Sequence, residues 1–172
     1  LSAASGAGEI AFGSDVVSIK PFRDNLIIFC KESIYRMAGS SSADFQIAPV
    51  TRNIGCLSHF SIQEIGGDLI FLAPDGLRTI AGTEKIGDTE LGTISKQIQT
   101  RVNSLSQDQL SRISSHVIKA KSQYRIYYPV DATAEASCTG LISVIKRNLG
   151  TGQVGWEFSD IKGIKPKFAS SG

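Results

Sequence analysis

One stretch of the sequence occurs twice, and this repeat constrains the fold more than any other feature. Residues 18–39 (SIKPFRDNLIIFCKESIYRMAG) align without a gap with residues 61–82 (SIQEIGGDLIFLAPDGLRTIAG), 43 residues further along the chain. Six of the 22 aligned positions are identical: Ser18/Ser61, Ile19/Ile62, Leu26/Leu69, Ile27/Ile70, Ala38/Ala81 and Gly39/Gly82. The units lack the three- and four-residue apolar spacing of helical repeats. A period of about 40 to 45 residues built from short strands is typical of β-propeller blades.

The central strand of each unit is apolar on both faces. Residues 25–30 (NLIIFC) and 68–73 (DLIFLA) carry apolar side chains at successive positions, so both faces of each strand must be covered. In a propeller this happens because each blade packs against two neighbours. Turn residues separate the runs at Arg23-Asp24, at Gly66-Gly67 and at Pro74-Asp75-Gly76. The first unit therefore predicts four antiparallel strands, at residues 16–19, 25–30, 33–37 and 45–50, and the second unit repeats this plan.

The apolar period changes after the second unit. Ile94, Ile98, Val102 and Leu105 are spaced by four, four and three residues, with Thr93 as a candidate N-cap, which predicts an amphipathic helix over about 94–105. Beyond it, residues 115–121 and 123–130 predict a hairpin, and residues 141–147 and 154–158 predict two more strands. Gln123 aligns with Asn25 once a 12-residue insertion that matches the helix is allowed for. We interpret this region as a third, diverged blade.

The fold class predicted is all-β with one inserted amphipathic helix. Residues 1–172 are expected to form a single β-propeller-type domain with about three four-stranded antiparallel blades, over about 16–50, 60–92 and 114–158. Because propellers have about four or more blades, we expect these three to belong to a larger propeller. The opening LSAASGAG, which lacks an initiating Met, and the small polar ending FASSG also favour an excerpt of a longer polypeptide.

Composition excludes several classes of protein. The chain has 18 basic and 16 acidic residues, a formal net charge of +2 that is too balanced for nucleic-acid binding by bulk electrostatics. No apolar run approaches the roughly 18 residues of a membrane span, and no signal-peptide pattern opens the chain. Three widely spaced cysteines, Cys30, Cys56 and Cys138, fit buried thiols better than a disulfide framework.

Cofactor and metal motifs are weak. Gly150-Thr-Gly-Gln-Val-Gly155 matches the dinucleotide fingerprint G-x-G-x-x-G, but a strand pattern follows it where the mechanism needs a helix, so we interpret it as a hairpin turn. His59 and His116 have no second ligand at the spacing that zinc requires. Cys56 lies close to His59 but lacks a basic cluster that would lower its thiol pKa. We therefore predict no cofactor and no metal, and a small buried side chain at Cys56.

Catalytic patterns are absent as well. The acidic residues of the repeat fall at turns, where Asx geometry explains them: Asp24, Glu32, Asp68 and Asp75. The Ser-x-Asp-x-Gly-x-x-Trp turn of sialidases is missing, and no acid pair or nucleophile motif suggests a hydrolase. The sequence thus predicts that the protein is not an enzyme. Hydrolytic activity that is abolished by a substitution at Asp24 or Asp75 would instead support a hydrolase.

The third unit carries the one basic cluster of interest. It comprises Lys119, Lys121, Arg125, Lys146 and Arg147, with Tyr124, Tyr127 and Tyr128 interleaved. Basic and aromatic side chains together could face DNA or a partner, although a solvated outer face is the simpler interpretation.

Residues 16 to about 105 resemble the propeller region of the tail nozzle family (tail tubular protein B) of short-tailed bacteriophages. The resemblance is carried by IKPFRDNLIIFCKESIYRMAG, then Ile54-Gly55-Cys56 and Ser61-Ile62, then GGDLIFLAPDGL at 66–77 and Ile94-Ser95. It covers about half of the chain well and the third unit more loosely. The family supplies no catalytic residues that could be carried over.

The resemblance implies a structural virion protein of the phage tail, made in the host cytoplasm. It would assemble as a ring, expected to be hexameric, beneath the portal and adaptor proteins. The ring would contact tail fibre proteins and enclose the conduit through which DNA passes during ejection. The alternative is a propeller binding module for a host glycan or a protein partner. Glycan binding would call for aromatic platforms, for which Trp156 and the tyrosines near 124–128 are the available candidates.

Overall fold

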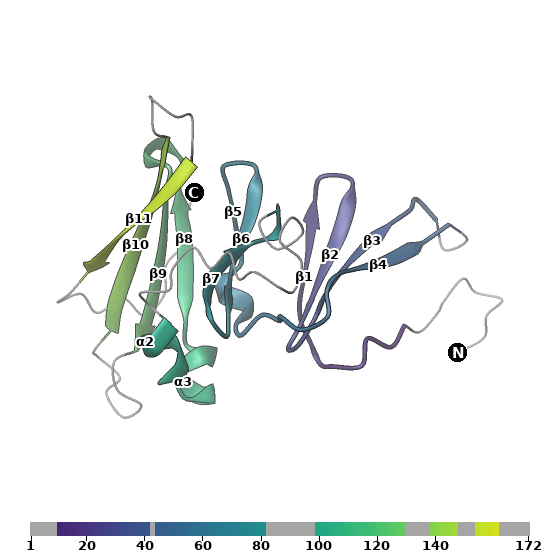
Figure 1. The fold of residues 1–172 in the computed structure, drawn as a ribbon, viewed down its shortest axis with the longest axis horizontal. Coiled ribbons are helices and arrows are strands. Elements are labelled where there is room, and N and C mark those ends of the chain that lie inside the picture. Colours follow the sequence, from purple (N-terminus) through teal and green to yellow (C-terminus); the bar gives the residue numbers. More distant parts are fainter. Residues whose placement is uncertain (1–9, 42–43, 82–98, 130–137, 148–153, 162–172) are drawn as a thin grey trace.

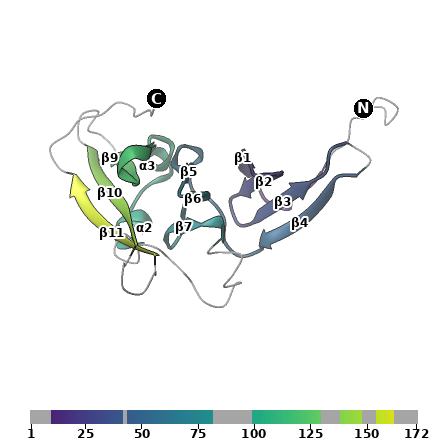
Figure 2. The ribbon, with the colours of Figure 1, turned by 90° about the horizontal axis from the view of Figure 1, so that it is seen from above.

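The computed structural model describes residues 10–41, 44–81, 99–129, 138–147 and 154–161. The fold is mostly β, with three separate antiparallel sheets of three or four strands. The sheets follow one another across the molecule in chain order, from the purple-blue first sheet to the green and yellow third sheet (Figure 1). A view from above shows the same order (Figure 2).

Each sheet is a simple meander in which consecutive strands are neighbours. The first sheet has the order β1-β2-β3-β4 and the second the order β5-β6-β7, whereas the third runs β8 to β11 in the same way. The strands are β1 (Val16–Phe22), β2 (Asn25–Cys30), β3 (Ile34–Ala38), β4 (Gln46–Thr51), β5 (Gln63–Ile65), β6 (Asp68–Ala73), β7 (Gly76–Thr79), β8 (Ser114–Ile118), β9 (Gln123–Pro129), β10 (Cys138–Arg147) and β11 (Val154–Ile161). The four strands predicted for the first unit are confirmed, with β1 and β4 at the two edges of the sheet.

The turn between β5 and β6 has the positive φ angles that its glycines predict. Gly66 and Gly67 have φ values of 62° and 77°, which confirms the positive-φ turn expected between β5 and β6. The matching turn of the first unit places Arg23 at φ 52°, and Arg23 donates a hydrogen bond of 2.9 Å to the Gly67 carbonyl. The two equivalent hairpin tips therefore lie side by side.

Hydrophobic packing between the sheets follows the repeat. We call the face of a sheet that packs against the next sheet its front face, and the opposite face its back face. One cluster joins the first sheet to the second, and its first-sheet members are Phe22, Ile27, Phe29 and Ile34. Another cluster joins the second sheet to the third, and its second-sheet members are Ile65, Ile70, Leu72 and Leu77. Each of these four lies 43 residues after its counterpart, so equivalent residues form equivalent front faces.

The back faces show the same equivalence. Ile62, Leu69 and Phe71 of the second unit pack toward the first sheet. Val117, Tyr124 and Ile126, each 55 residues later, pack toward the second sheet. The rings of Phe29 and Phe71 meet edge to face across the first junction, 5.3 Å apart at their centroids. This confirms that β6 packs between two sheets, as the sequence predicted. A described sheet covers only the front face of β2, although Ile28 and Cys30 on its back face are themselves buried.

The helical segment differs from the prediction of one helix over 94–105. Residues 82–98, including Ile94 and Ile98, lie outside the described residues. The described part has two short helices, α2 (Gln99–Asn103) and α3 (Gln107–Ser111). Ser106 separates them because it forms a capping box: its hydroxyl accepts from the Gln109 N–H, and the Gln109 side chain accepts from the Ser106 N–H.

Two smaller predictions also need correction or qualification, and the rejected dinucleotide motif can be placed. The described part of the second sheet has three strands, not four, and residues 82–92 lie outside it. Lys119–Lys121 forms a 3₁₀ turn (η4) rather than the end of a strand, closed by Ser122 in the left-handed region. Gly155 lies within β11, and strand, not helix, follows it, so the dinucleotide interpretation of that motif fails; Gly150 and Gly152 lie outside the described residues.

A buried ion pair stabilises the turn between β6 and β7. Arg78 has 1% of its surface exposed, and its Nε donates a hydrogen bond of 2.8 Å to Asp75 Oδ1. A second bond joins Arg78 Nη2 to Asp75 Oδ2, which makes the pair bidentate. The sequence predicts a turn at Asp75, but no local pattern indicates that Arg78 is buried with it.

Candidate functional site

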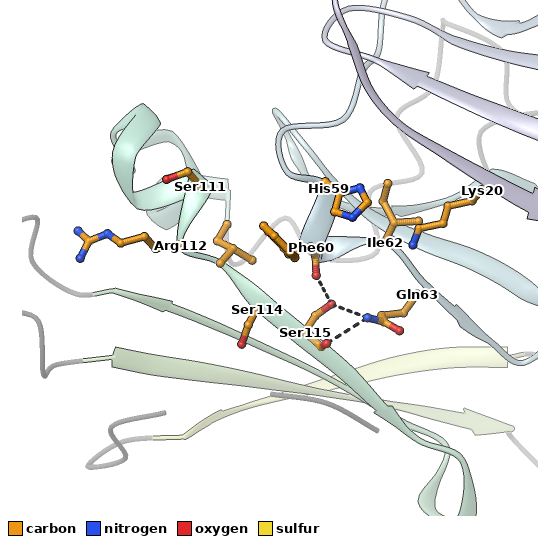
Figure 3. Close-up of a pocket in the computed structure, with 10 residues that line it drawn as sticks. Lys20, His59, Phe60, Ile62, Gln63, Ser111, Arg112, Ser114 and Ser115 are labelled. Atoms are coloured by element: carbon orange, nitrogen blue, oxygen red, sulfur yellow. Dashed lines mark hydrogen bonds between the residues drawn. The ribbon is translucent and has the colours of Figure 1, made fainter. Parts of the chain in front are cut away.

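A pocket of about 510 Å³ opens where the three sheets meet η2 (His59–Ser61) and the end of α3. Its wall combines β1, η2, β5, the end of α3 and β8 (Figure 3). The residues lining it are Lys20, His59, Phe60, Ile62, Gln63, Ser111, Arg112, Ile113, Ser114 and Ser115. The pocket thus collects side chains that lie up to 95 residues apart in the sequence, from Lys20 to Ser115.

Ser61 fixes the position of η2 at the base of this pocket. Its hydroxyl donates to the Ser58 carbonyl at 2.6 Å and accepts from the Leu72 N–H at 3.1 Å. Its carbonyl accepts from the Tyr124 hydroxyl at 2.9 Å. Burial raises the pKa of Tyr124, so this hydroxyl remains a donor. Because Ser61 is tied to both β6 and β9, the two preceding residues, His59 and Phe60, are directed outward.

The polar floor of the pocket is held by a chain of hydrogen bonds. The Gln63 amide donates to the Ser115 carbonyl at 3.0 Å and to its hydroxyl at 3.2 Å. The Ser115 hydroxyl in turn donates to the Phe60 carbonyl. These bonds, dashed in Figure 3, link the second sheet to the third across the floor. The floor is therefore preorganised before any ligand arrives.

The charged residues of the lining are all basic. Lys20 from β1 and Arg112, the C-cap residue of α3, lie on opposite sides of Phe60 (Figure 3). No hydrogen bond or ion pair joins Lys20 to the other described residues, whereas Arg112 pairs with Asp108 at 2.8 Å on the helix surface. None of the ten lining residues is acidic. The pocket consequently favours an anion.

Phe60 provides an exposed aromatic face in the middle of the pocket. Its exposure is 56%, although Ile62 and Ile113 beside it are buried. The His59 ring meets it edge to face at 5.1 Å, and His59 is itself held by a contact of 2.8 Å between Nδ1 and the Ser18 hydroxyl. The flat face of Phe60 is therefore available for stacking.

The basic residues predicted to face DNA or a partner gather at one end of the third sheet. Lys119 and Lys121 are exposed on η4, at the tip of the β8–β9 hairpin. Lys146 and Arg147 follow Val144 on β10, and Val144 pairs with Gln123, so their backbone lies at the same end. Arg125 lies further along β9 and donates to the Gln123 side chain at 2.9 Å. This end of β8 is opposite to the one that lines the pocket.

The tyrosines do not accompany these basic residues as the sequence suggested. Tyr124 is fully buried in the cluster between the second and third sheets, and Tyr128 packs against that cluster. Tyr127 is 8% exposed and stacks on His116, with centroids 5.5 Å apart. Burial, and then the charge of Arg125, lower the pKa of His116 and keep it neutral at pH 7. Tyr124 and Tyr127 are therefore not available to stack on a partner beside these basic residues.

The cysteine and acidic residues considered in the sequence analysis have structural roles. Cys56 is fully buried and donates to the Ser58 carbonyl, and burial raises its pKa to about 11, which confirms a small buried side chain there. Asp68 accepts from the Leu69 and Ala81 N–H groups, as expected of an acidic residue at a turn. Within the part of the chain that the structure describes, no three His, Cys, Asp or Glu side chains form a group that could hold a metal ion. No described helix has the length and hydropathy that crossing a membrane requires.

A second surface is open at the other end of the row of sheets. The strand registers place eight apolar residues on the back face of the first sheet: Ile19, Pro21, Leu26, Ile28, Tyr35, Met37, Ile47 and Pro49. Ile19 is 51% exposed, whereas its counterparts Ile62 and Val117, on the back faces of the other two sheets, are 3% and 5% exposed. Phe12 covers one corner, where its ring meets that of Tyr35 at 5.0 Å. This is the one back face in the structure that no described sheet covers.

Sequence reasoning missed the pocket. Lys20 lies in a strand, and Phe60 follows His59, which has no second metal ligand nearby in the sequence. Arg112 lies just after a helix that the sequence did not predict. No local pattern connects them, because only the packing of the three units brings them together.

No protein-family model and no curated protein matches the chain. Among solved structures, it is similar to a chain of a yeast (S. cerevisiae) complex of a Dbp5 variant with Nup159, a Gle1 variant, IP6 and ADP. The match has 11% sequence identity and a TM-score of 0.34, and it covers 88% of this chain and 50% of that one. This chain therefore spans about half the length of the protein that it matches.

Proposed function

We propose that the chain is a structural, non-catalytic protein of a bacteriophage tail nozzle, in which its three sheets are blades of a larger β-propeller. The resemblance of residues 16 to about 105 to the nozzle family motivates the choice of nozzle. The stacked sheets support the assembly role, because the same repeat positions form the front face at both junctions.

The observation that carries the proposal is the open back face of the first sheet. Of the eight apolar residues on this face, Ile19, Pro21 and Pro49 are exposed and four more are partly exposed, whereas Ile28 is buried. An exposed apolar patch of this kind marks an interaction site. At both junctions inside the structure, the same face receives the front face of a preceding sheet. We therefore infer that a further blade packs there.

The opposite end of the row differs. The third sheet carries Arg125 and Tyr127 on its front face, where the second sheet has Ile70 and Leu72. His116 shares this face with them. Ile142 and Val144 of β10 share this face, so it is mixed in polarity and still offers apolar surface to a further blade.

The exact repeat makes the inference directly testable. Residues 16–58 span one period, so a second copy inserted before Val16 adds one unit without changing the spacing. With Ile19→Cys in the original unit, we expect labelling at that position to slow about tenfold or more in the extended chain, because the added front face covers it. Mass-spectrometric peptide mapping separates this cysteine from the native ones. The matched control carries Ile27→Glu in the added copy, which places a charge on the covering face and should restore fast labelling.

Equal labelling rates with and without the added unit would refute the blade interpretation. The nozzle assignment has its own test, electron microscopy of the assembled protein. We expect rings of several copies around a channel, with tail fibre and portal–adaptor partners at their surfaces. A monodisperse monomer under assembly conditions would contradict the nozzle role even if the blades stack as proposed.

The pocket favours a second candidate, a propeller binding module for a glycan or protein partner. Phe60 is an exposed aromatic residue among polar side chains, which is the arrangement that such recognition uses. A glycan array distinguishes this function, because binding that is lost in Phe60→Ala would support it.

A further inference from the structure

The pocket beside η2 combines three properties that are independent of any role in a phage tail. Its lining charges are basic, its centre is an exposed aromatic ring, and its floor is fixed by hydrogen bonds between two sheets. Its volume of about 510 Å³ lies within the range of roughly 300–1,000 Å³ that is typical of small-molecule sites.

Lys20 is the group that indicates the charge of the ligand. It lines the pocket from β1, has no hydrogen-bond or ion-pair partner among the described residues, and faces a lining without carboxylates. Arg112 lies on the other side of Phe60, but its side chain points away from the ring and pairs with Asp108, so Lys20 supplies the free positive charge. Low-dielectric walls strengthen the field of like charges in a concave site. An anionic group is therefore the expected partner of the Lys20 ammonium.

Phe60 indicates the rest of the ligand. An aromatic ring that is 56% exposed leaves apolar surface in water, and Ile62 and Ile113 make the adjoining wall apolar. Because the His59 ring supports Phe60 from the side, a planar or apolar group can stack on the free face without reorganising the ring.

A nucleic-acid strand fits this arrangement less well. Such a strand needs a continuous basic track along its backbone. Lys119 and Lys121, the exposed basic residues of the third sheet nearest in sequence, lie at the far end of β8 from the pocket. The positive charge of the pocket is thus local and suits a single anionic group.

We propose that this pocket binds a compact ligand that joins one anionic group, a carboxylate or a phosphate, to an aromatic or apolar group. The anion lies against Lys20, and the apolar part stacks on Phe60. The side chains of Gln63 and Ser115, already joined by hydrogen bonds, form the floor beneath it.

The test uses the whole chain, labelled with ¹⁵N, and four small probes. Phenylacetate and phenyl phosphate carry the proposed chemistry, benzyl alcohol is the neutral match, and benzylamine is the cationic match. We expect saturable amide shifts confined to residues 19–21, 59–63 and 111–115 with both anions, at least about tenfold weaker binding of benzyl alcohol, and no such shifts with benzylamine. Whichever of the two anions binds more tightly shows whether the anionic group of the ligand is a carboxylate or a phosphate.

Variants assign the roles. Lys20→Gln should weaken the anions about tenfold and leave benzyl alcohol unchanged, whereas Phe60→Ala should weaken all three by a similar factor. Lys119→Gln is the matched control, an exposed lysine outside the pocket, and should change nothing. Unchanged dispersion of the amide spectrum shows that each variant is folded.

Several results would overturn the proposal. Equal affinity for benzyl alcohol and phenylacetate would show that the charge plays no part. Anion binding unaffected by Lys20→Gln would place the site elsewhere, as would shifts that map to the back face of the first sheet. Shifts from a short oligothymidylate that extend to Lys119 and Lys121 would show a nucleic-acid track instead.

Discussion

The ion pair between Asp75 and Arg78 gives the sharpest test of how the second sheet is stabilised. The Arg78 side chain is 2% exposed and that of Asp75 is 17% exposed, so the guanidinium has little access to water. In Asp75→Asn the carboxylate charge is lost while the shape remains, and a buried cation is left without its partner. Breaking a buried pair from one side costs about 3–5 kcal/mol.

The converse change should behave differently. Arg78→Met removes the buried charge and keeps an apolar side chain of similar length, leaving Asp75 at a turn with partial access to water. Replacing buried ionic groups by apolar ones is often neutral or stabilising. We therefore expect Arg78→Met to cost far less than Asp75→Asn, and the double variant to be close to Arg78→Met alone.

Urea unfolding measures both effects. With a slope of about 2 kcal/mol per M, a loss of 3–5 kcal/mol lowers the midpoint by roughly 1.5–2.5 M. The control is Asp15→Asn, which breaks the exposed pair with Lys31 (side chains 76% and 57% exposed) and should leave the urea midpoint nearly unchanged. If Asp75→Asn were as mild as Asp15→Asn, or if Arg78→Met were equally damaging, the reasoning about the buried charge would be wrong.

Three further predictions follow from single contacts. Phe71→Ala should lower the free energy of unfolding by about 3–5 kcal/mol, because it opens a cavity against Phe29 at the first junction, and calorimetry or urea unfolding checks this. Ser106→Ala should cost about 1 kcal/mol by removing the cap of α3, while Ser106→Asp should keep most of the stability. Hydrogen bonds from the backbone N–H groups of Ser41 and Ser40 lower the pKa of Asp44 from 3.8 to about 2. Because the folded-state pKa is depressed, this stabilisation is present above about pH 4 and is lost as the pH falls through 2; a carboxyl titration by NMR that gives an ordinary pKa would contradict it.

Much of the fold could be predicted because the same pattern of strands and turns occurs in two aligned segments. The central strands β2 and β6 begin and end where the sequence placed them, since both are apolar at successive positions and bounded by turn residues. The Gly66-Gly67 turn followed from the backbone freedom of glycine. The helical segment was harder, because the capping box at Ser106 ends one helix and starts another within a few residues.

The candidate sites could not be predicted in the same way. Tyr124 alternates with basic residues along the sequence, but strand alternation and the register of β9 place it in the core. Lys20, Phe60 and Arg112 follow no shared motif, so nothing in the sequence connects them before the sheets pack. Burial of Arg78 likewise depends on the neighbouring sheet, which its local sequence does not reveal.

The sequence by itself determined the strands, their order and the apolar rows on each face, because side-chain alternation and turn chemistry act over a few residues. Only the tertiary structure decided which of those rows are covered. Equivalent residues such as Ile19 and Ile62 have the same local sequence signal but opposite exposure, since exposure depends on whether another sheet lies against them. The pocket forms where units distant in the chain pack together. The back face of the first sheet is open because no described sheet packs against it.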